Sequence, residues 1–481
     1  MLNSIFSYNA KSITNHNKLW LYFFSIVFLN IVFKIIQLDF SSFWYDEIIS
    51  VESASLDFGH IKHVSEWDNN PPFYYYCLSV WIKLFNDTEF YVRFLSVLFS
   101  SFSGGILFLL ANKHFNRTTA IVVSLIYLSS NIIFFYSHEA RAYSLVVLLS
   151  LISSSLYLNF KQNSSLKIAL LLGIVNFLLI YTHYISGIVI FFQVLLIFIY
   201  FEKKQAALFS YSIGVIVFLT LIRFTKKQFL LILNFNDSEK TFWLQKSSIK
   251  YLNEVASNFL FHKTMIVPFI LIIILGIFLI FNKKIKKSYF VVTYVTLVGI
   301  GSIFILFFLG KMTPIFLDRY LIFTLPFIFI LIALGLSFFK NQNIIVTLSF
   351  VFFVFSAFKI NYKTDKGMNY KNAVYFIKHL KKESDLIIVK TKDIKPLFCY
   401  YYDSKFLSHQ KKELPINENI IFCTSWDDVD RDVNKFNRII VVDSFEDLNQ
   451  KENEFVTKLS MKKTKIHTLD YFKGIKITFY K

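Results

Sequence analysis

The sequence predicts an all-α polytopic membrane protein that carries a small C-terminal α/β domain. Three observations predict this fold class: 55% of the 481 residues are hydrophobic, only 17% are charged, and long apolar windows recur between residues 19 and 358. A helix of about 17–25 apolar residues crosses the roughly 30 Å of hydrocarbon in a bilayer. A soluble protein would need about a quarter of its residues charged, so soluble, disordered and fibrous classes are excluded.

About eleven apolar windows are expected to span the membrane within a transmembrane domain of residues 1–360. They cover residues 19–38, 90–111, 118–136, 142–160, 166–182, 184–200, 206–222, 264–281, 289–309, 318–338 and 343–358. Basic turns alternate with turns of mixed charge along the chain. The positive-inside rule places the basic turns in the cytoplasm and the mixed-charge turns outside. An odd number of spans puts residues after 360 outside as well.

The net charge of +19 does not indicate nucleic-acid binding, because many of the lysines lie in short turns between apolar windows, where they anchor the topology. The three cysteines, Cys77, Cys399 and Cys423, form no close pair, so they predict neither a zinc ribbon nor a disulfide framework. The sequence requires no cofactor, and a divalent metal is possible but unsupported.

The C-terminal residues, 361–481, have a different pattern. Short apolar runs at 386–389, 420–422 and 438–442 are separated by charged segments, and residues 372–382 have helical spacing. This pattern predicts a soluble extracytoplasmic α/β domain with an accessory or acceptor-facing role.

The first outer loop contains an acidic pair, Asp46 and Glu47, directly after two aromatic residues of the headgroup region. Apolar residues follow at helical spacing, and a second helix is expected after Pro71 and Pro72. Two helices on the outer face would wall a cavity at the membrane boundary. A carboxylate there could take a proton from an incoming hydroxyl. The alternative is that the pair is only solvated.

The next outer turn holds His138, Glu139 and Arg141 between two apolar windows. Charges so close to hydrocarbon usually bind a ligand or form a satisfied pair. Arginine donates two hydrogen bonds to phosphate from its planar fork, so Arg141 is the candidate phosphate ligand. The alternatives are a local pair between Glu139 and Arg141 or a contact of the arginine with a lipid headgroup.

Three further candidates for substrate binding lie at outer ends of the windows. His183 could ligate a metal, bond a phosphate, shuttle a proton or satisfy an interfacial hydrogen bond. Arg93 and Arg319 are each compatible with a structural role. Arg319, beside Asp318, is the better candidate for a second phosphate contact.

The ordered motifs of this chain resemble those of the GT-C superfamily of membrane glycosyltransferases. They are "WYDE", "NNPPFYYYCLSVWIKLFNDTEFYVRFLS", "YSHEARAYSL", "YTHY" and "DRYLIFTLP". The chain is most similar to the bacterial branch related to protein O-mannosyltransferases and the lipid A aminoarabinose transferase. The resemblance covers nearly the whole chain.

The resemblance implies transfer of a sugar, with inversion, from a polyprenyl-phosphate carrier to an acceptor hydroxyl on the outer face of a bacterial inner membrane. It implies that Asp46 is the catalytic base, with Glu47 beside it, and that Arg141 holds the carrier phosphate. His183 and Arg319 match further outer-face positions. Cations beside the departing phosphate would stabilise the charge that grows on it in the transition state.

One departure from the family concerns the residues before the proline pair. The lipid A branch has a glutamate and a lysine there, whereas this chain has Asn69 and Asn70. This difference argues against aminoarabinose transfer and against a metal at that place.

Three other functions are open from the sequence. An oligosaccharide polymerase or ligase would use a diphosphate carrier. A transporter or flippase would need polar residues along a path across the bilayer, whereas here they gather at one face. A non-catalytic scaffold would display the C-terminal domain. The acceptor, whether glycan, lipid or protein, is not indicated.

Overall fold

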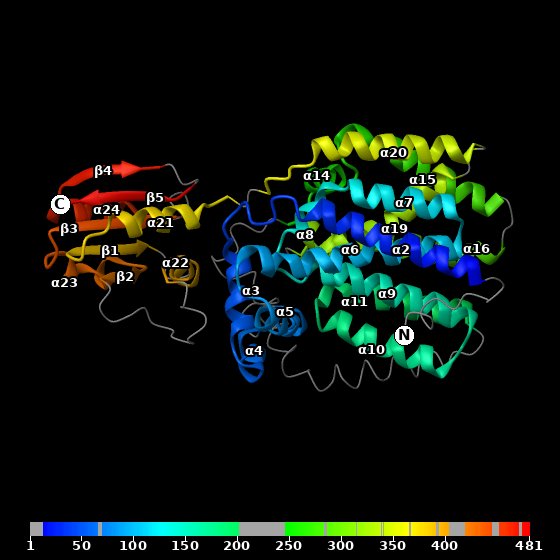
Figure 1. Cartoon of the computed structure of the whole chain (residues 1–481), viewed down its shortest axis with the longest axis horizontal. Coiled ribbons are helices and arrows are strands. Elements are labelled where there is room, and N and C mark those ends of the chain that lie inside the picture. The colour runs from blue at the N-terminus through cyan, green and yellow to red at the C-terminus, as the bar shows by residue number, and fades with distance from the viewer. Residues whose placement is uncertain are drawn as a thin grey trace. The chain divides into compact units, whose positions relative to one another are not determined.

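In the described residues up to 359 the regular elements are helices, and an α/β domain follows (Figure 1). The computed structural model describes residues 13–65, 70–201, 246–282, 286–313, 315–337, 339, 341–364, 367–390, 394–403, 419–444, 452–470 and 474–481. The chain divides into two units. The helical unit comprises Met1–Ile36, Lys62–Cys77 and Arg93–Tyr362, and the mixed unit comprises Gln37–Ile61, Leu78–Val92 and Lys363–Lys481.

The helical unit is built mainly from apolar α-helices. They are α2 (Ile13–Lys34), α6 (Glu89–His114), α7 (Arg117–Ser129), α8 (Asn131–Ser137), α9 (Tyr143–Gln162), α10 (Leu166–Ile180), α11 (Gly187–Tyr200), α14 (Ile249–Phe259), α15 (Ile266–Asn282), α16 (Lys286–Thr296), α17 (Ser302–Leu309), α18 (Asp318–Leu321), α19 (Leu325–Leu336) and α20 (Gln342–Lys359). A π-helical turn, Leu297–Gly301, joins α16 to α17.

Six helices in the described part of the chain are long and apolar enough to cross a membrane, or up to eight if each of two bent pairs is one span. Two shorter apolar stretches, Leu166–Ile180 and Tyr184–Tyr200, match two more predicted windows. The chain is therefore an integral membrane protein of the predicted all-α class, but the number eleven is not confirmed. The predicted span at 206–222 lies outside the described residues.

The window predicted as one span at 118–136 is broken in the structure. Its two helices, α7 and α8, meet at an angle of 63°. Ser130 has an extended backbone between them, and its hydroxyl accepts a hydrogen bond from the backbone N–H of Ile133. Serine in this position caps a new helix, so the chain turns without a proline.

Close packing and buried polar contacts hold the helices together. A Cβ atom added to Gly276 of α15 would lie 2.8 Å from the Cα of Gly335 in α19, so only glycine allows these backbones to approach. Gln193 of α11 donates to Ser153 of α9 at 2.8 Å and accepts from Asn176 of α10 at 3.0 Å. These bonds satisfy polar groups that water cannot reach and fix the helix register.

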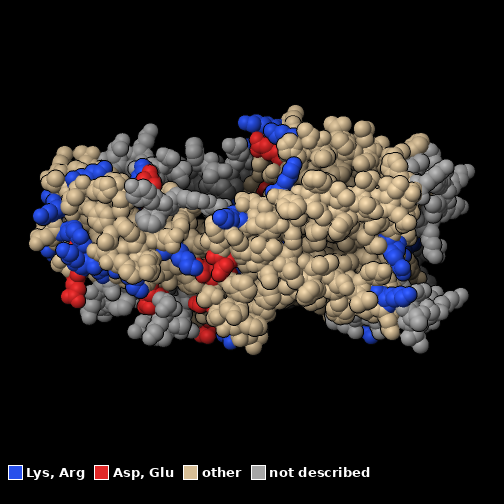
Figure 2. Space-filling view, turned by 45° about the horizontal axis from the view of Figure 1, so that its top comes forward, with Lys and Arg blue, Asp and Glu red and all other residues tan. Residues whose placement is uncertain are grey.

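The outer surface of the helices suits contact with lipid. On the face that Figure 2 shows, the helical unit is largely uncharged, whereas basic and acidic side chains are frequent on the C-terminal domain. Helix α20 exposes large apolar residues, including Leu348, Phe355 and Phe358. A soluble protein rarely exposes such a continuous apolar surface.

The C-terminal domain has a five-stranded sheet in the order β2-β1-β3-β5-β4. Strands β1 (Asp385–Lys390), β2 (Ile420–Cys423) and β3 (Arg438–Asp443) are parallel, while β4 (Lys465–Leu469) and β5 (Lys476–Tyr480) are antiparallel. Its helices are α21 (Tyr370–Leu380), α22 (Lys395–Tyr402), α23 (Asp430–Val433) and α24 (Glu452–Lys462). The predicted α/β fold is confirmed, and the parallel strands are the three apolar runs of the sequence.

The loop between α2 and α6 contains three helices in its described residues, α3 (Tyr45–Ser55), α4 (Phe58–Ser65) and α5 (Phe73–Leu84). Helices α3 and α5 are the two helices that the sequence predicts there. Residues 37–61 and 78–92 of this region belong to the same unit as the C-terminal domain. Most of this loop and the C-terminal domain therefore share a unit, which their separation in sequence does not indicate.

Candidate active site

In the helical unit, three predicted site residues from distant parts of the chain come close together; Arg141 and His183 are buried, and Arg319 is half-buried. Arg141 follows α8, His183 lies between α10 and α11, and Arg319 lies in the short helix α18. Burial, followed by the positive charges of Arg141 and Arg319, lowers the pKa of His183 to about 4. Two guanidinium groups are thus close enough to one imidazole to disfavour its protonation.

Tyrosine side chains surround these three residues. One nitrogen of the Arg141 guanidinium donates to the phenol of Tyr75 at 3.4 Å. The ring of Tyr320 lies 5.0 Å from the His183 ring, and that of Tyr143 lies 6.5 Å from it. The phenol of Tyr143 is within electrostatic range of both arginines. We call the group of Arg141, His183 and Arg319 with these tyrosines the cationic cluster.

Two carboxylates accompany the cationic cluster. Asp318 accepts a hydrogen bond from the phenol of Tyr136 and another from the backbone N–H of Arg319, each 2.8 Å long. Glu139 is buried and acts electrostatically on Tyr136, as Asp318 does. The arginines are therefore held among acidic and phenolic neighbours, which lowers the cost of burying their charge.

His138 and Arg93 are buried completely. The Nε2 atom of His138 donates to the backbone carbonyl of Lys34 at 2.7 Å, and its ring lies 4.3 Å from that of Phe134. These contacts explain why His138 is buried, and they anchor the turn that carries Arg141.

Lys34 is a buried residue that is not among the candidates predicted from the sequence. It ends α2, and its ammonium donates to Asn30 and to Ser100, both at 2.8 Å. The only signal in the sequence is a lysine within an otherwise apolar window. Likewise, the tyrosines of the cationic cluster could be found only as part of motifs such as "FYYYC" and "DRYL", because aromatic residues are common throughout the chain.

The acidic pair of the first loop belongs to the mixed unit, at the start of α3. Asp46 is partly exposed and lies in the first helical turn, and Glu47 is fully buried. The Oε2 atom of Glu47 accepts a hydrogen bond from the backbone N–H of Trp44 at 3.3 Å, which satisfies one N–H group at the start of the helix. The two carboxylates therefore differ: that of Glu47 is buried and bonded at the helix N-terminus, whereas that of Asp46 is partly exposed.

Some candidate metal ligands lie close together in the sequence. In the sequence, His60 and His63 are three residues apart, and Asp430 and Asp432 are two apart. Among the residues that the structure describes, however, no three His, Cys, Asp or Glu side chains gather as a metal site. Asn69 lies outside the described residues, so the departure at that position stays a sequence observation.

The family model described as dolichyl-phosphate-mannose-protein mannosyltransferase matches residues 69–224. This match includes Arg141 and His183. A crystal structure of ArnT from Cupriavidus metallidurans bound to undecaprenyl phosphate matches with a TM-score of 0.61 and 11% identity, over 97% of this chain and 98% of that one. The apo ArnT structure matches equally well, with 96% and 97% covered. The chain has the GT-C glycosyltransferase fold.

The same GT-C fold is found in the archaeal oligosaccharyltransferase AglB from Archaeoglobus fulgidus, solved with an inhibitory peptide and a dolichol-phosphate. Its TM-score is 0.51 at 9% identity, over 88% of this chain and 70% of AglB. No curated protein sequence matches the chain. The resemblance to the GT-C superfamily that the motifs predict is thus confirmed at the level of the fold.

Proposed function

We propose that this protein is an inverting glycosyltransferase that moves a sugar from a polyprenyl-phosphate carrier to an acceptor hydroxyl on the outer face of the membrane. The observation that carries the proposal is the cationic cluster, where Arg141 and Arg319 lie close to a single neutral histidine. Paired guanidinium groups are suited to a phosphate, because their donors are planar and permanently charged. The ArnT structure with undecaprenyl phosphate supports the choice of a polyprenyl carrier.

In the proposed reaction, the carboxylate of Asp46 takes the proton of the acceptor hydroxyl. The acceptor oxygen attacks the anomeric carbon, and the bond between that carbon and the phosphate oxygen breaks. The carrier leaves as a phosphate monoester, which has one more negative charge than the diester. Arg141, with Arg319, stabilises this charge, and His183 contributes a hydrogen bond without a charge.

Transfer of a single sugar is favoured over transfer of a whole oligosaccharide. ArnT is matched over 98% of its length, whereas 30% of AglB has no counterpart here, from the 70% that is covered. An oligosaccharyl ligase remains the second candidate, since AglB has the same fold. The mass of the product distinguishes the two functions, because one adds a single residue and the other a block.

The test uses purified protein in nanodiscs, incubated with a panel of polyprenyl-phosphate sugars and analysed by mass spectrometry. We expect one donor to be consumed and Asp46→Asn to lower the rate by about 100- to 10,000-fold, because a general base contributes that much. Asp39→Asn is the matched control, since Asp39 is an exposed carboxylate in the same unit. Consumption of no donor, or full activity of Asp46→Asn, would overturn the proposal.

The outer location of the C-terminal domain is tested separately. Lys465 at the start of β4 is exposed. A Lys465→Cys variant in intact cells should react with a membrane-impermeant maleimide. Labelling only after the cells are lysed would place the domain in the cytoplasm.

A further inference from the structure

The chain segment that leads into α3 is held by helix α22 and the residues around it in the C-terminal domain. The hydroxyl of Ser42 donates to the backbone carbonyl of Met368 at 2.9 Å. The backbone N–H of Phe43 donates to the phenol oxygen of Tyr401 at 2.7 Å. The ring of Phe43, which is fully buried, packs edge-on against Tyr400 with 5.3 Å between the ring centroids.

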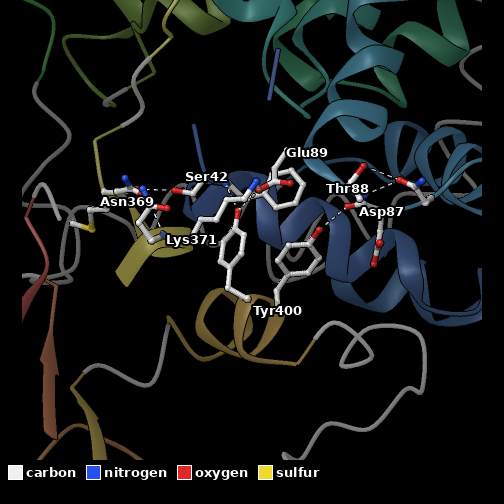
Figure 3. A network of polar contacts seen from close by, with 12 residues as sticks. Ser42, Asp87, Thr88, Glu89, Asn369, Lys371 and Tyr400 are labelled. Atoms are coloured by element: carbon white, nitrogen blue, oxygen red, sulfur yellow. Dashed lines mark hydrogen bonds and ion pairs between the residues drawn. The ribbon is translucent and has the colours of Figure 1, made fainter. Parts of the chain in front are cut away.

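The same two tyrosines also hold the first residue of α6 and the residues just before it. The phenol of Tyr401 donates to Oε1 of Glu89 at 3.1 Å, and that oxygen lies 3.1 Å from the ammonium of Lys371. The phenol of Tyr400 donates to the backbone carbonyl of Asp87 at 3.0 Å. Figure 3 shows Lys371 meeting Glu89, while the side chain of Tyr400 points towards Asp87.

Tyr401 is the centre of this arrangement because its single hydroxyl group is used twice. The oxygen accepts from Phe43, and the hydrogen is given to Glu89. Glu89 is only 6% exposed, so its charge depends on the phenol and on Lys371 for stabilisation. A phenol that accepts one hydrogen bond and donates another is held in one orientation. A phenylalanine at this position would lack both bonds.

The contacts continue from Tyr401 to the first turn of α3. Phe43 directly precedes Trp44, which is the N-cap residue, and the N–H of Trp44 is bonded to Glu47. Two successive backbone N–H groups are therefore fixed, one by the C-terminal domain and one by the carboxylate of Glu47. Asp46 lies in the turn that follows directly, so its position depends on both bonds.

We propose that Tyr401 and Glu89 are positioning residues for Asp46, so that the C-terminal domain takes part in the reaction by setting the place of the base. This inference rests on the proposed function of Asp46. A displacement of about 1 Å at a reacting group can cost on the order of 100-fold in rate, so a clamp on the backbone beside the base has a large effect.

The first test is the Tyr401→Phe variant, which removes one hydroxyl and leaves the ring. We expect kcat to fall by about 10- to 100-fold, while the Kd for undecaprenyl phosphate stays within about twofold of the wild type. Tyr375→Phe is the matched control, because Tyr375 lies on α21 of the same domain and is 64% exposed. Glu89→Gln keeps an acceptor for the phenol and should be several-fold more active than Glu89→Ala. Wild-type kcat in Tyr401→Phe would overturn the inference.

A double-mutant cycle separates positioning from general damage to the fold. Asp46→Glu moves the carboxylate by one methylene, which leaves a measurable rate. If Tyr401 acts through Asp46, adding Tyr401→Phe to Asp46→Glu costs much less than it does in the wild type. Equal costs in both backgrounds, or a parallel loss of donor binding, would assign Tyr401 a purely structural role and end the proposal.

Hydrogen exchange tests the clamp without any activity assay. We expect Tyr401→Phe to raise the exchange rate of the backbone amides of residues 43–50 at least tenfold, with Tyr375→Phe unchanged. Unchanged protection would overturn the clamp even if the enzyme is active. If Tyr401→Phe raises these exchange rates but the wild type consumes no donor, the contacts of Tyr401 are supported and the proposed function fails.

Discussion

The phenol of Tyr136 donates a 2.8 Å hydrogen bond to Oδ1 of Asp318, which is 182 positions later in the chain. The same carboxylate oxygen accepts from the backbone N–H of Arg319, also at 2.8 Å. Tyr136 lies in α8, just before the turn that carries Arg141, and Asp318 begins α18. One carboxylate therefore connects the segments that carry the two arginines of the cationic cluster.

The Tyr136→Phe variant should loosen this connection. The phenylalanine ring keeps the packing but leaves Asp318 without the phenol, so we expect a loss of about 1 kcal/mol in stability and about a five- to tenfold weaker affinity for undecaprenyl phosphate. Thermal unfolding in detergent and lipid binding by native mass spectrometry measure the two effects. Tyr200→Phe, in the exposed last turn of α11, is the control. Equal affinities of the two variants would contradict a role for the Tyr136–Asp318 bond.

Arg141→Ala should mainly weaken the binding of the carrier. A charged hydrogen bond contributes about 1.5–3 kcal/mol, so the Kd for undecaprenyl phosphate should rise by roughly 10- to 100-fold. Arg141→Lys keeps the charge but loses the planar fork, and we expect an intermediate Kd. Arg117→Ala, at the exposed start of α7, is the matched control. Unchanged carrier affinity in Arg141→Ala would remove its phosphate role.

The elements that the sequence predicts well are those whose hydrophobic pattern is local. Long apolar windows became α6, α9 and α20, and the short run at 438–442 became β3. The break at Ser130 is not local in this sense, because one serine in an apolar window is compatible with a continuous helix. Only the neighbouring helices decide whether its side chain caps a new one.

The candidate site was partly predictable for a similar reason. Charged residues beside apolar windows are conspicuous, so Arg141, His183 and Arg319 could be found from the sequence. Their tyrosine neighbours could not, because 27 tyrosines occur in the chain and only the fold selects among them. Tyr401 could not be found either, since its two partners, at positions 43 and 89, come from another part of the sequence.

Glu47→Gln should mainly lower stability and Asp46→Asn should mainly lower the transfer rate, although the two residues are neighbours. The Glu47 carboxylate caps the N-terminus of α3, where a negative charge is favourable, so Glu47→Gln should cost about 0.5–1 kcal/mol in stability. Its transfer rate should stay within a few-fold of the wild type, whereas Asp46→Asn should lose transfer at a similar or smaller cost in stability. Thermal unfolding and product formation measured on the same preparations check this. A loss of activity in Glu47→Gln at unchanged stability would instead make Glu47 a catalytic residue.

The pH dependence of stability should contain a part that is due to His183. Its pKa in the folded protein is about 4, mainly because it is buried, whereas a histidine in the unfolded chain has a pKa of about 6.5. Between these values the unfolded chain binds more protons than the folded protein, so stability falls as the pH is lowered from 6.5 towards 4, by up to about 1.4 kcal/mol per pH unit. His183→Asn should lack this part and unfold with a shallower dependence on pH.

Phosphate bound beside His183 should raise its pKa, because an anion favours the imidazolium. Undecaprenyl phosphate should therefore stabilise the wild type more at pH 5 than at pH 7, and the variant equally at both. Thermal unfolding with and without the lipid at the two pH values measures this difference. If the stabilisation by the lipid changes equally with pH in the wild type and in His183→Asn, His183 does not face the bound phosphate.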